Sequence, residues 1–367
     1  MKENLNGELK VIGMRGCEDF TAQVDYYLKQ TRGTDTSFIA SAQCPRFGSG
    51  EAKALINESM RGLDLYIISD CFNYGVTYKM YGMQVPMSPD DHFQDLKRVI
   101  AATGGKTRRI SVIMPMLYEG RQHKRSARES LDCALALQEL THMGVSNIIT
   151  FDAHDARVQN SIPLCGFDNV RPAYQMLKAL LRNVPDVNLD KEHIMVVSPD
   201  EGAISRSMYI ASVLGIELGM FYKRRNYSII IDGKNPIEAH EYLGNDLHGK
   251  DVIVVDDMIS SGDSMIDVAL QLKERGAKRV FVFATFALFC NGLEKFDKAY
   301  EEKVFDKIFA TNLTYHTKEI LSREWYCDVN MSKYVSYIID TLNKDASIST
   351  LLNPVQKIHS LLDKHFE

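Results

Sequence analysis

The sequence lacks the marks of a membrane protein, a secreted protein and a disulfide-stapled domain. Its longest apolar run, VFVFATFALFC from Val280, is shorter than the roughly 20 residues that span a bilayer. The amino-terminal MKENLNGELK has no apolar core, unlike a signal peptide. The seven cysteines are scattered, without CxxC or Cys/His ligand spacing, which favours free thiols in a reducing compartment. We therefore expect a cytoplasmic protein with no membrane association.

An excess of positive charge is also lacking. Lys and Arg total 43 against 48 Asp and Glu, a net charge of -5. Because affinity for a phosphate backbone comes from clustered Lys and Arg, this balance disfavours a nucleic-acid partner and leaves room for a local phosphate site. With 45% hydrophobic residues among 367, the chain is long and apolar enough for two domains.

Short apolar runs alternate with segments of helical period. Met265, Val268, Ala269 and Leu272 fall on one face of a helix that Gly276 would end. Strand–helix–strand order predicts an α/β fold with mainly parallel sheets and right-handed crossovers. The runs predicted to be central strands are Ile110–Met114, Asn147–Phe151, Ile194–Val197, Val252–Val255 and Arg279–Phe283.

The two halves of the chain share a pattern of helix, terminal glycine and apolar strand. Ser130–Phe151 parallels Ser264–Phe283. Either any two βαβ units look alike, or an α/β domain is duplicated, with a boundary near Cys165–Pro172. We predict a first domain over residues 1–168 and a second over 169–344. Helices in 345–367 return to the first domain, and Pro354 begins the last of them.

One motif resembles a nucleotide-binding sequence but does not meet its requirements. The GGKT of Gly104–Thr107 resembles the end of a nucleotide-binding P-loop, but that motif needs a glycine five residues before its Gly-Lys pair, where Ile100 stands. No apolar strand leads into it, so we interpret it as a solvated loop.

The stretch DVIVVDDMISSGDSM, from Asp251, joins an apolar strand to paired carboxylates and a small polar turn. Ligands of parallel sheets lie beyond the carboxyl ends of strands, where Asp256 and Asp257 could accept hydrogen bonds from sugar hydroxyls. Ser260–Ser264 leads into a helix whose first amide groups, with Gly262 allowing close approach, suit a phosphate. The alternative is an ordinary turn with a serine cap. Together the two halves favour a ribose phosphate.

VVDDMISSGDS resembles the phosphoribosyl diphosphate-binding motif of type I phosphoribosyltransferases. Over nearly its whole length the chain also resembles the ribose-phosphate diphosphokinases. The segments that carry this resemblance are RFGSGE (Arg46–Glu51), INESMRG (Ile56–Gly62), EGRQHKRSAR (Glu119–Arg128), FDAHDARVQN (Phe151–Asn160), VSPDEGAISR (Val197–Arg206) and YKRR (Tyr222–Arg225). The family implies two similar type I phosphoribosyltransferase-like domains and a homo-hexamer built from dimers. Its reaction transfers the diphosphoryl group of ATP to the C1 hydroxyl of ribose 5-phosphate with Mg2+.

The resemblance also implies a role for individual residues. Lys223 and Arg225 match the catalytic pair, and His154 and Asp200 match positions around magnesium and the ATP phosphates. The implied ATP-binding residues are Phe47, Glu51, Arg121 and Gln122. The implied ribose 5-phosphate residues are Asp256, Asp257, Ser260, Ser261, Gly262, Asp263 and Ser264. A regulatory phosphate or ADP site would comprise Ser59, Arg61, Ser347 and Ser349.

The chain departs from the family pattern at several places. Ser49 replaces an Asp that helps to hold adenine, and His123 replaces an Asp near the ATP phosphates, which leaves the nucleotide preference open. Segments 74–105 and 226–245 are longer than usual. A non-catalytic regulatory homologue that assembles with active subunits is the alternative. The ATP-site segments disfavour a phosphoribosyltransferase that uses the product.

Overall fold

The computed structural model describes residues 6–366 apart from 226–236, and within these it does not describe the side chains of 223–225, 237–240 and 364–366. The chain forms two compact units. Unit 1 comprises Met1–Pro172, Asn312–Tyr315 and Asn330–Asn353; unit 2 comprises Ala173–Thr311, His316–Val329 and Pro354–Glu367. No helix in the described part of the chain is long and apolar enough to cross a membrane.

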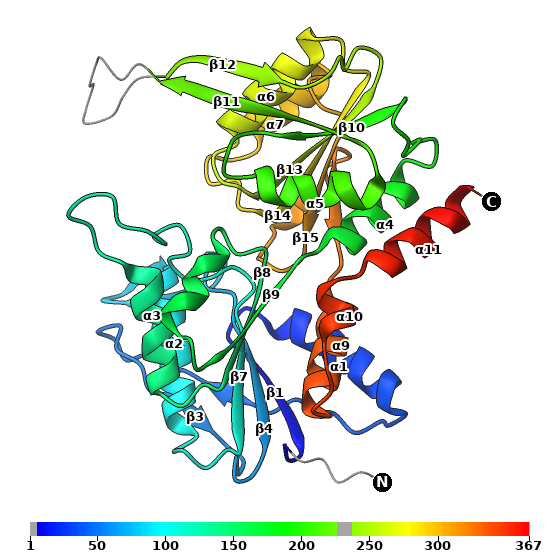
Figure 1. The fold of residues 1–367 in the computed structure, drawn as a ribbon. Helices are drawn as coiled ribbons and strands as arrows, with labels where there is room; N and C mark the ends of the chain where they lie inside the picture. The colour runs from blue at the N-terminus through cyan, green and yellow to red at the C-terminus, as the bar shows by residue number, and fades with distance from the viewer. Residues whose placement is uncertain (1–5, 226–236, 367) are drawn as a thin grey trace. The chain divides into compact units, whose positions relative to one another are not determined.

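Unit 1 is built on a parallel five-stranded sheet in the order β1-β4-β7-β8-β9. Its strands are β1 (Leu9–Gly13), β4 (Asp64–Ile68), β7 (Arg109–Ile113), β8 (Asn147–Phe151) and β9 (Gly166–Val170). Its helices are α1 (Glu18–Arg32), α2 (Pro89–Ala102), α3 (Asp132–His142), η1 (Ala156–Ser161), α9 (Ser332–Asn343) and α10 (Ser349–Leu352). Helices α2 and α3 bury Leu96 and Leu137 against Leu65 and Val112 of the sheet. Helices α1 and α9 pack side by side at its other face (Figure 1).

Two small antiparallel hairpins lie outside this sheet. The first joins β2 (Ala42–Gln43) to β3 (Leu55–Ile56). The second joins β5 (Thr77–Met80) to β6 (Met83–Pro86) and occupies part of the long segment 74–105, which also contains α2.

Unit 2 holds a seven-stranded sheet in the order β12-β11-β10-β13-β14-β15-β16, in which β12 alone is antiparallel to its neighbour. The strands are β10 (Ile194–Ser198), β11 (Glu217–Arg225), β12 (Ile237–Leu243), β13 (Asp251–Ile259), β14 (Arg279–Ala287), β15 (Lys307–Thr311) and β16 (Tyr326–Val329). The helices are α4 (Ala173–Asn183), α5 (Ile204–Leu214), α6 (Asp263–Glu274), α7 (Glu294–Glu301), α8 (Lys318–Leu321) and α11 (Val355–Phe366).

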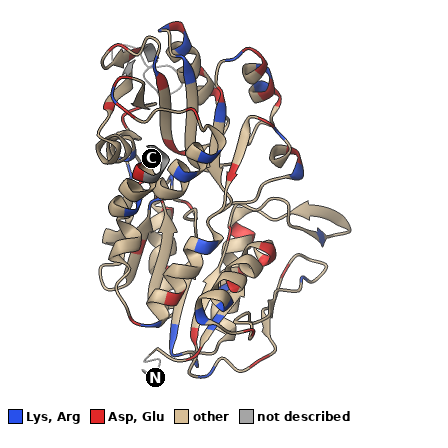
Figure 2. Ribbon diagram, turned by 90° about the vertical axis from the view of Figure 1, so that its right-hand side faces the viewer, with Lys and Arg blue, Asp and Glu red and all other residues tan. Residues whose placement is uncertain are grey.

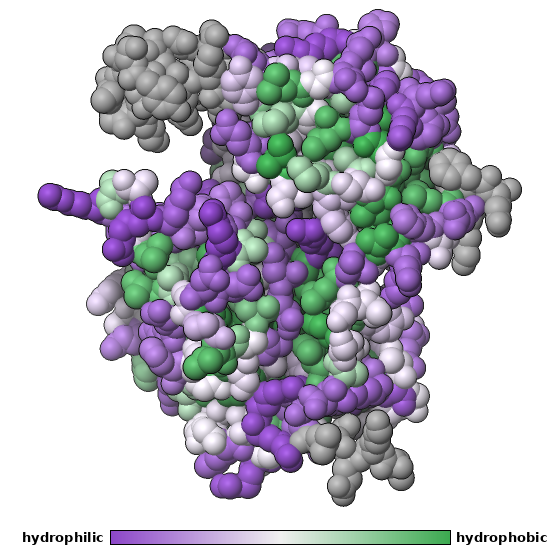
Figure 3. Space-filling view, viewed as in Figure 1, coloured by the Kyte–Doolittle hydropathy of each residue, from purple (hydrophilic) through white to green (hydrophobic). Residues whose placement is uncertain are grey.

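Alternate residues of the central strands of unit 2 feed two cores. Val252 and Val254 pack with α6 and α7, whereas Ile253 and Val255 pack with α4, α5 and α11. This double burial explains why β13 is apolar along most of its length. On the outer side of α5, hydrophobic side chains reach the surface (Figure 3), and Met208 is 51% exposed.

The five predicted central strands and the α6 face are confirmed, and Met265, Val268, Ala269 and Leu272 are all buried. Strand β13 is longer than predicted: it continues to Ile259 because β14 still pairs with it at Ile259↔Ala287. Asp256 and Asp257 therefore belong to the strand and do not follow it.

The units and the predicted domains divide the C-terminal segment differently. Helices α9 and α10 group with unit 1, whereas α11, which follows Pro354, packs on α4 and α5 of unit 2. The predicted domain boundary at residue 168 stays a prediction.

An Arg–Asp ion pair joins the amino ends of two neighbouring strands in each unit. Charges of both signs are interspersed along the chain (Figure 2). Arg109 of β7 donates to both oxygens of Asp64 on β4, at 2.8 and 2.7 Å. Arg279 of β14 donates to both oxygens of Asp251 on β13, at 3.0 and 2.6 Å. In each unit the two residues are register neighbours on adjacent parallel strands. This repetition favours a duplicated domain over generic βαβ similarity.

We expect Arg109→Leu to lower the free energy of unfolding by about 3–5 kcal/mol, because it leaves the fully buried Asp64 carboxylate without its cation. Urea denaturation monitored by circular dichroism measures the change. The exposed neighbour Arg108 provides the matched control, Arg108→Leu, which should leave the urea midpoint unchanged. An Arg109→Leu protein with the wild-type midpoint would contradict the assignment.

Candidate functional site

The carboxyl end of β13 carries the paired aspartates beyond the reach of its neighbour β10. Pairing of β10 with β13 stops at Val197↔Val254, whereas pairing with β14 continues past Asp256. Where the aspartates stand, β13 therefore has no strand partner on its β10 side, at the edge where parallel sheets receive ligands.

Arg206, in the first turn of α5, holds this pair together. Its Nη1 lies 3.5 Å from Oδ1 of Asp256 and 3.5 Å from Oδ1 of Asp257. The Asp257 side chain is only 4% exposed and that of Asp256 23% exposed. The sequence-based expectation that both carboxylates face an open pocket is therefore wrong for Asp257, because the Arg206 cation lets it be buried.

The charges of this cluster act on one another. Burial, followed by the negative charge of Asp257, raises the pKa of Asp256 well above its ordinary value, and Arg206 opposes the shift. Asp200 adds a further negative charge that raises the same pKa. A cation or several hydroxyl donors at this edge would therefore stabilise the ionised pair.

The segment Ser260–Gly262 turns directly into α6. Gly262 has φ +88°, and a Cβ there would lie 2.0 Å from Cζ of Phe296 on α7. The chain after β14 holds the turn from the other side, since the Cys290 amide donates to the Ser260 carbonyl at 2.9 Å. A loop held this firmly presents its amides and hydroxyls in a fixed arrangement.

The first turn of α6 suits an anion. Ser264 and Asp263 are exposed there, and the positive end of the helix dipole lies at this turn. Asp263 would oppose an anion, but Lys295 of α7 pairs with it and lowers its pKa below the ordinary value. Lys295 thus offsets the negative charge closest to the turn.

Asp200 has a structural duty besides any ligand role. Its Oδ1 accepts from the amides of Gly202 at 2.9 Å and Ala203 at 3.2 Å, which shapes the entry to α5. Among the described side chains, no three His, Cys, Asp or Glu gather as a ready-made metal cage.

The predicted catalytic pair lies at the end of β11. Lys223 and Arg225 pair with β12 through their backbones, with an irregularity between Arg224 and Arg225. Their side chains lie outside the described part of the chain, as do residues 226–236.

In unit 1, the loop between β7 and α3 carries Arg121 and Gln122. It extends from the sheet and presents a hydrophilic surface (Figures 1 and 3). The Gln122 side chain donates to the carbonyls of Ser130 at 2.8 Å and Lys124 at 3.3 Å. Gln122 therefore closes its own loop, and Arg121 is the member of the pair that is exposed.

His154, just after β8, lies with His123 in one cluster. Their ring centroids are 5.3 Å apart, and His123 Nε2 lies 3.5 Å from Oδ2 of Asp155. A hydrogen bond from Arg157 is the main cause that lowers the pKa of Asp155 to about 2. His123, which stands where the family has an Asp, therefore lies beside the carboxylate of Asp155, which is ionised throughout the physiological pH range.

The loop Phe47–Glu51 is tight. The Phe47 amide donates to the Glu51 carbonyl at 2.7 Å, and the Gly50 amide donates to the Phe47 carbonyl at 2.9 Å. The Ser49 hydroxyl donates to a Glu51 carboxylate oxygen at 2.8 Å. Phe47 is 54% exposed.

The four predicted regulatory residues are all exposed. The Arg61 amide donates to the Ser59 hydroxyl at 3.4 Å, and the hydroxyls of Ser347 and Ser349 are 2.6 Å apart. These contacts are local to each pair, and the regulatory assignment stays a prediction.

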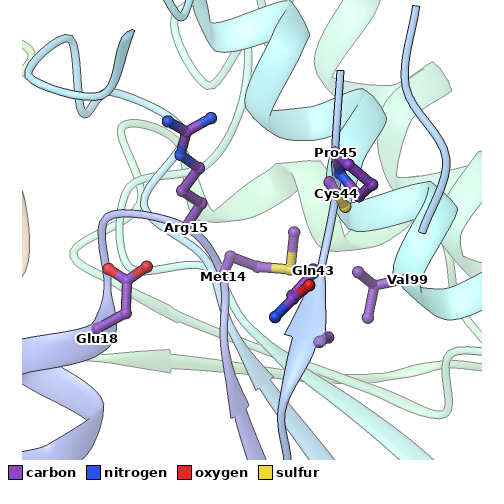
Figure 4. Close-up of a pocket in the computed structure, with 8 residues that line it drawn as sticks. Met14, Arg15, Glu18, Gln43, Cys44, Pro45 and Val99 are labelled. Carbon is purple, nitrogen blue, oxygen red and sulfur yellow. The ribbon is translucent and has the colours of Figure 1, made fainter. Parts of the chain in front are cut away.

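Unit 1 also contains a cavity of about 310 Å³ that the sequence did not indicate (Figure 4). None of the predicted site residues lines it. The lining residues are Met14, Arg15, Glu18, Ala42, Gln43, Cys44, Pro45 and Val99.

Sequence reasoning missed Arg206, Phe296 and Lys295. Arg206 is the last residue of the segment Val197–Arg206. A basic residue in the first turn of a helix that follows a strand was therefore the signal that could have pointed to it. Its target could not be read, because the adjacency of β10 and β13 appears only in the sheet order. No sequence signal pointed to Lys295 or Phe296, which lie more than thirty residues along the chain from the loop they support.

Comparisons with known proteins cover most of the chain. The N-terminal domain of ribose phosphate pyrophosphokinase matches residues 9–144, and the phosphoribosyl transferase domain matches residues 168–317. The chain is 30% identical to the ribose-phosphate pyrophosphokinase of Vibrio cholerae over 322 residues, which cover 86% of this chain and 92% of that protein. It is 30% identical to that of Mycoplasma genitalium over 274 residues, which cover 73% and 74% respectively.

A solved structure shares the fold. The crystal structure of phosphoribosylpyrophosphate synthetase from Mycobacterium smegmatis aligns with a TM-score of 0.74 at 20% identity, covering 92% of this chain and 100% of that one. The predicted fold class is confirmed.

We expect Gly262→Ala to weaken the binding of ribose 5-phosphate by about tenfold or more, because the new Cβ would collide with Phe296 and displace the loop. Isothermal titration calorimetry measures the affinity. Gly249→Ala is the matched control: Gly249 also has positive φ, +77°, but has nothing within 4 Å of its Cβ position. Equal affinities for the two variants would contradict a cradle formed by this turn.

We expect Asp256→Asn to stabilise the protein at neutral pH. The raised pKa means that wild-type stability falls as pH rises from the ordinary aspartate value toward the folded-state pKa, and the asparagine removes this loss. Thermal unfolding at several pH values between about 4 and 8 measures the difference, which should vanish at the acidic end. Asp263→Asn, at a carboxyl whose pKa is lowered, should show the opposite sign. A stability difference for Asp256→Asn that does not depend on pH would contradict the charge assignment.

Proposed function

The chain belongs to the ribose-phosphate pyrophosphokinase family, and we propose that it transfers the diphosphoryl group of ATP to the C1 hydroxyl of ribose 5-phosphate, giving phosphoribosyl diphosphate and AMP. The observation that carries this proposal is the Asp256–Asp257–Arg206 cluster at the edge of the sheet, followed directly by the Ser260–Ser264 turn.

Ribose 5-phosphate binds at the carboxyl end of β13. Asp256 accepts hydrogen bonds from the ribose hydroxyls, which stabilises its ionised form, whereas the buried Asp257 pairs with Arg206. Ser260, Ser261, Gly262, Asp263 and Ser264 form the cradle for the 5-phosphate, through backbone amides, hydroxyls and the dipole of α6. Arg206 orients the carboxylates and compensates their charge.

The transfer requires positioning and positive charge, with little covalent work by the protein. Lys223 and Arg225 supply that charge to the transferred phosphoryl oxygens. Strand β11 lies next to the edge strand β12, and at Lys223 and Arg225 it pairs with β12 alone. This place supports the role, because a segment paired on one side can move toward a substrate more easily than a central strand.

Magnesium fits the donor set of unit 2. Carboxylate oxygens are the protein ligands it prefers, and it keeps most of its waters or takes phosphate oxygens, so a three-ligand cage is not required. Asp200 offers the oxygen that the amides of Gly202 and Ala203 leave free. When bound, the ion neutralises charge on the ATP phosphates. His154 is an imidazole and suits contact with phosphate oxygens or metal-bound water better than direct ligation.

The nucleotide uses unit 1. Phe47 stacks on the base through its exposed ring, and Glu51 and Ser49 meet the edge of the base. Arg121 pairs with the phosphates. Because Ser49 donates its proton to Glu51, its oxygen is left as an acceptor for an amino group such as that of adenine. We further propose a homo-oligomer in the cytoplasm, regulated by phosphate or ADP at Ser59, Arg61, Ser347 and Ser349.

We expect AMP release only when ATP, Mg2+ and ribose 5-phosphate are all present. A coupled assay for AMP, with ribose 5-phosphate omitted in parallel, tests the reaction. No AMP at saturating substrates and magnesium would overturn the proposal.

The catalytic pair is tested in the same assay. Lys223→Ala should lower kcat by about 100-fold or more while leaving the affinity for ribose 5-phosphate within twofold, because it removes charge needed mainly in the transition state. Lys191→Ala, at an exposed lysine of the same unit, is the control and should match the wild type. A Lys223→Ala enzyme with wild-type turnover would argue against this assignment.

A further inference from the structure

The β5–β6 hairpin rests against the Phe47–Glu51 loop. The Tyr81 amide at the tip of the hairpin donates to the Gly48 carbonyl at 2.9 Å. A Cβ at Gly50, whose φ is +94°, would lie 2.8 Å from the sulfur of Met80, so the loop backbone lies directly on the hairpin. These contacts join the hairpin to the connection between β2 and β3, which form another small sheet.

Arg46, which begins the loop, is locked between the hairpin and α2. Its side chain is 6% exposed, and Nη2 lies 2.8 Å from Asp95 Oδ2. The guanidinium carbon lies 4.7 Å from the centroid of the Tyr78 ring on β5. The Tyr78 hydroxyl in turn donates to Asp91 at 3.3 Å. Within the described part of the chain Arg46 Nε has no hydrogen-bond partner, and the Tyr78 ring adds a cation–π contact to the compensation that Asp95 provides.

The hairpin is itself anchored at its base. Arg15, at the rim of the cavity in Figure 4, donates from Nη2 to the Thr77 carbonyl at 2.8 Å. The Met87 amide donates to the Val76 carbonyl at 2.8 Å. A hairpin fixed at its base and in contact with the loop at its tip can hold that loop in one position.

The hairpin contributes little to the core of unit 1. No residue of β5 or β6 is buried: each is half-buried or exposed. Its apolar residues therefore do not account for its presence through the hydrophobic core, and its contacts with the loop are what distinguish it from an ordinary surface hairpin.

We propose that the β5–β6 hairpin is a positioning element for nucleotide recognition: through Tyr78 and Met80 it fixes the loop that carries Phe47, Ser49 and Glu51, and so sets the affinity for the nucleotide base. The inference rests on the proposed function, in which this loop receives the base. Tyr78 acts through Arg46 and does not touch the nucleotide.

Steady-state kinetics with ATP and with GTP test this role. Tyr78→Ser should raise KM for ATP about fivefold to tenfold and lower the preference for ATP over GTP, with kcat and KM for ribose 5-phosphate within twofold of wild type. Tyr78→Phe keeps the ring over Arg46 and should restore most of the affinity. Met83→Thr, at a 60% exposed position of the same hairpin, is the matched control and should behave as wild type.

Hydrogen–deuterium exchange supplies a readout that does not depend on turnover. The amides of Phe47 and Gly50 should exchange faster in Tyr78→Ser than in Met83→Thr, because the loop loses its support. An active wild type together with a Tyr78→Ser variant of unchanged KM for ATP would overturn the hairpin inference alone. A wild type that releases no AMP would instead overturn the proposed function.

Discussion

Two adjacent carboxylates at the end of a buried strand repel each other and resist burial, and the site of unit 2 is arranged around that constraint. Pairing of β10 with β13 ends at Val254, so that β13 has no strand partner on that side at Asp256. Arg206 then compensates the pair from α5. The compensation is partial, because the pKa of Asp256 remains raised. A sugar with several hydroxyls, or a cation, at this edge would stabilise the ionised Asp256 that Arg206 compensates only in part.

The opposite ends of the strands carry a different solution to the same problem. Asp64 and Asp251 are also buried carboxylates, but each is fully engaged by an arginine on the neighbouring strand. A saturated pair holds the fold and has no capacity left for a ligand, whereas the cluster at the carboxyl ends keeps some. In unit 2, β13 thus carries the saturated pair at its amino end and the candidate site at its carboxyl end, in agreement with the general placement of ligands in parallel sheets.

Tight loops bring the remaining polar groups into position. The Ser260–Gly262 turn is supported by Phe296, and the Phe47–Glu51 loop by the β5–β6 hairpin. In both cases a glycine with positive φ lies against a side chain from another element, so backbone position is fixed by packing and not by the loop alone. A change in Phe296 or in the hairpin should therefore alter the affinity of the supported loop for its ligand more than it alters the fold.

Apolar periodicity and a contiguous motif are local properties, and from them the sequence predicted five central strands, the α6 face, the paired aspartates with their polar turn and the family. It could not determine that Arg206 meets Asp256 and Asp257, that Lys295 offsets Asp263, or that Tyr78 lies against Arg46. It also assigned the last helix to the first domain, whereas α11 packs on α4 and α5. Each of these contacts joins residues far apart in the chain, and only strand order and helix packing decide which distant charges and rings come within reach of one another.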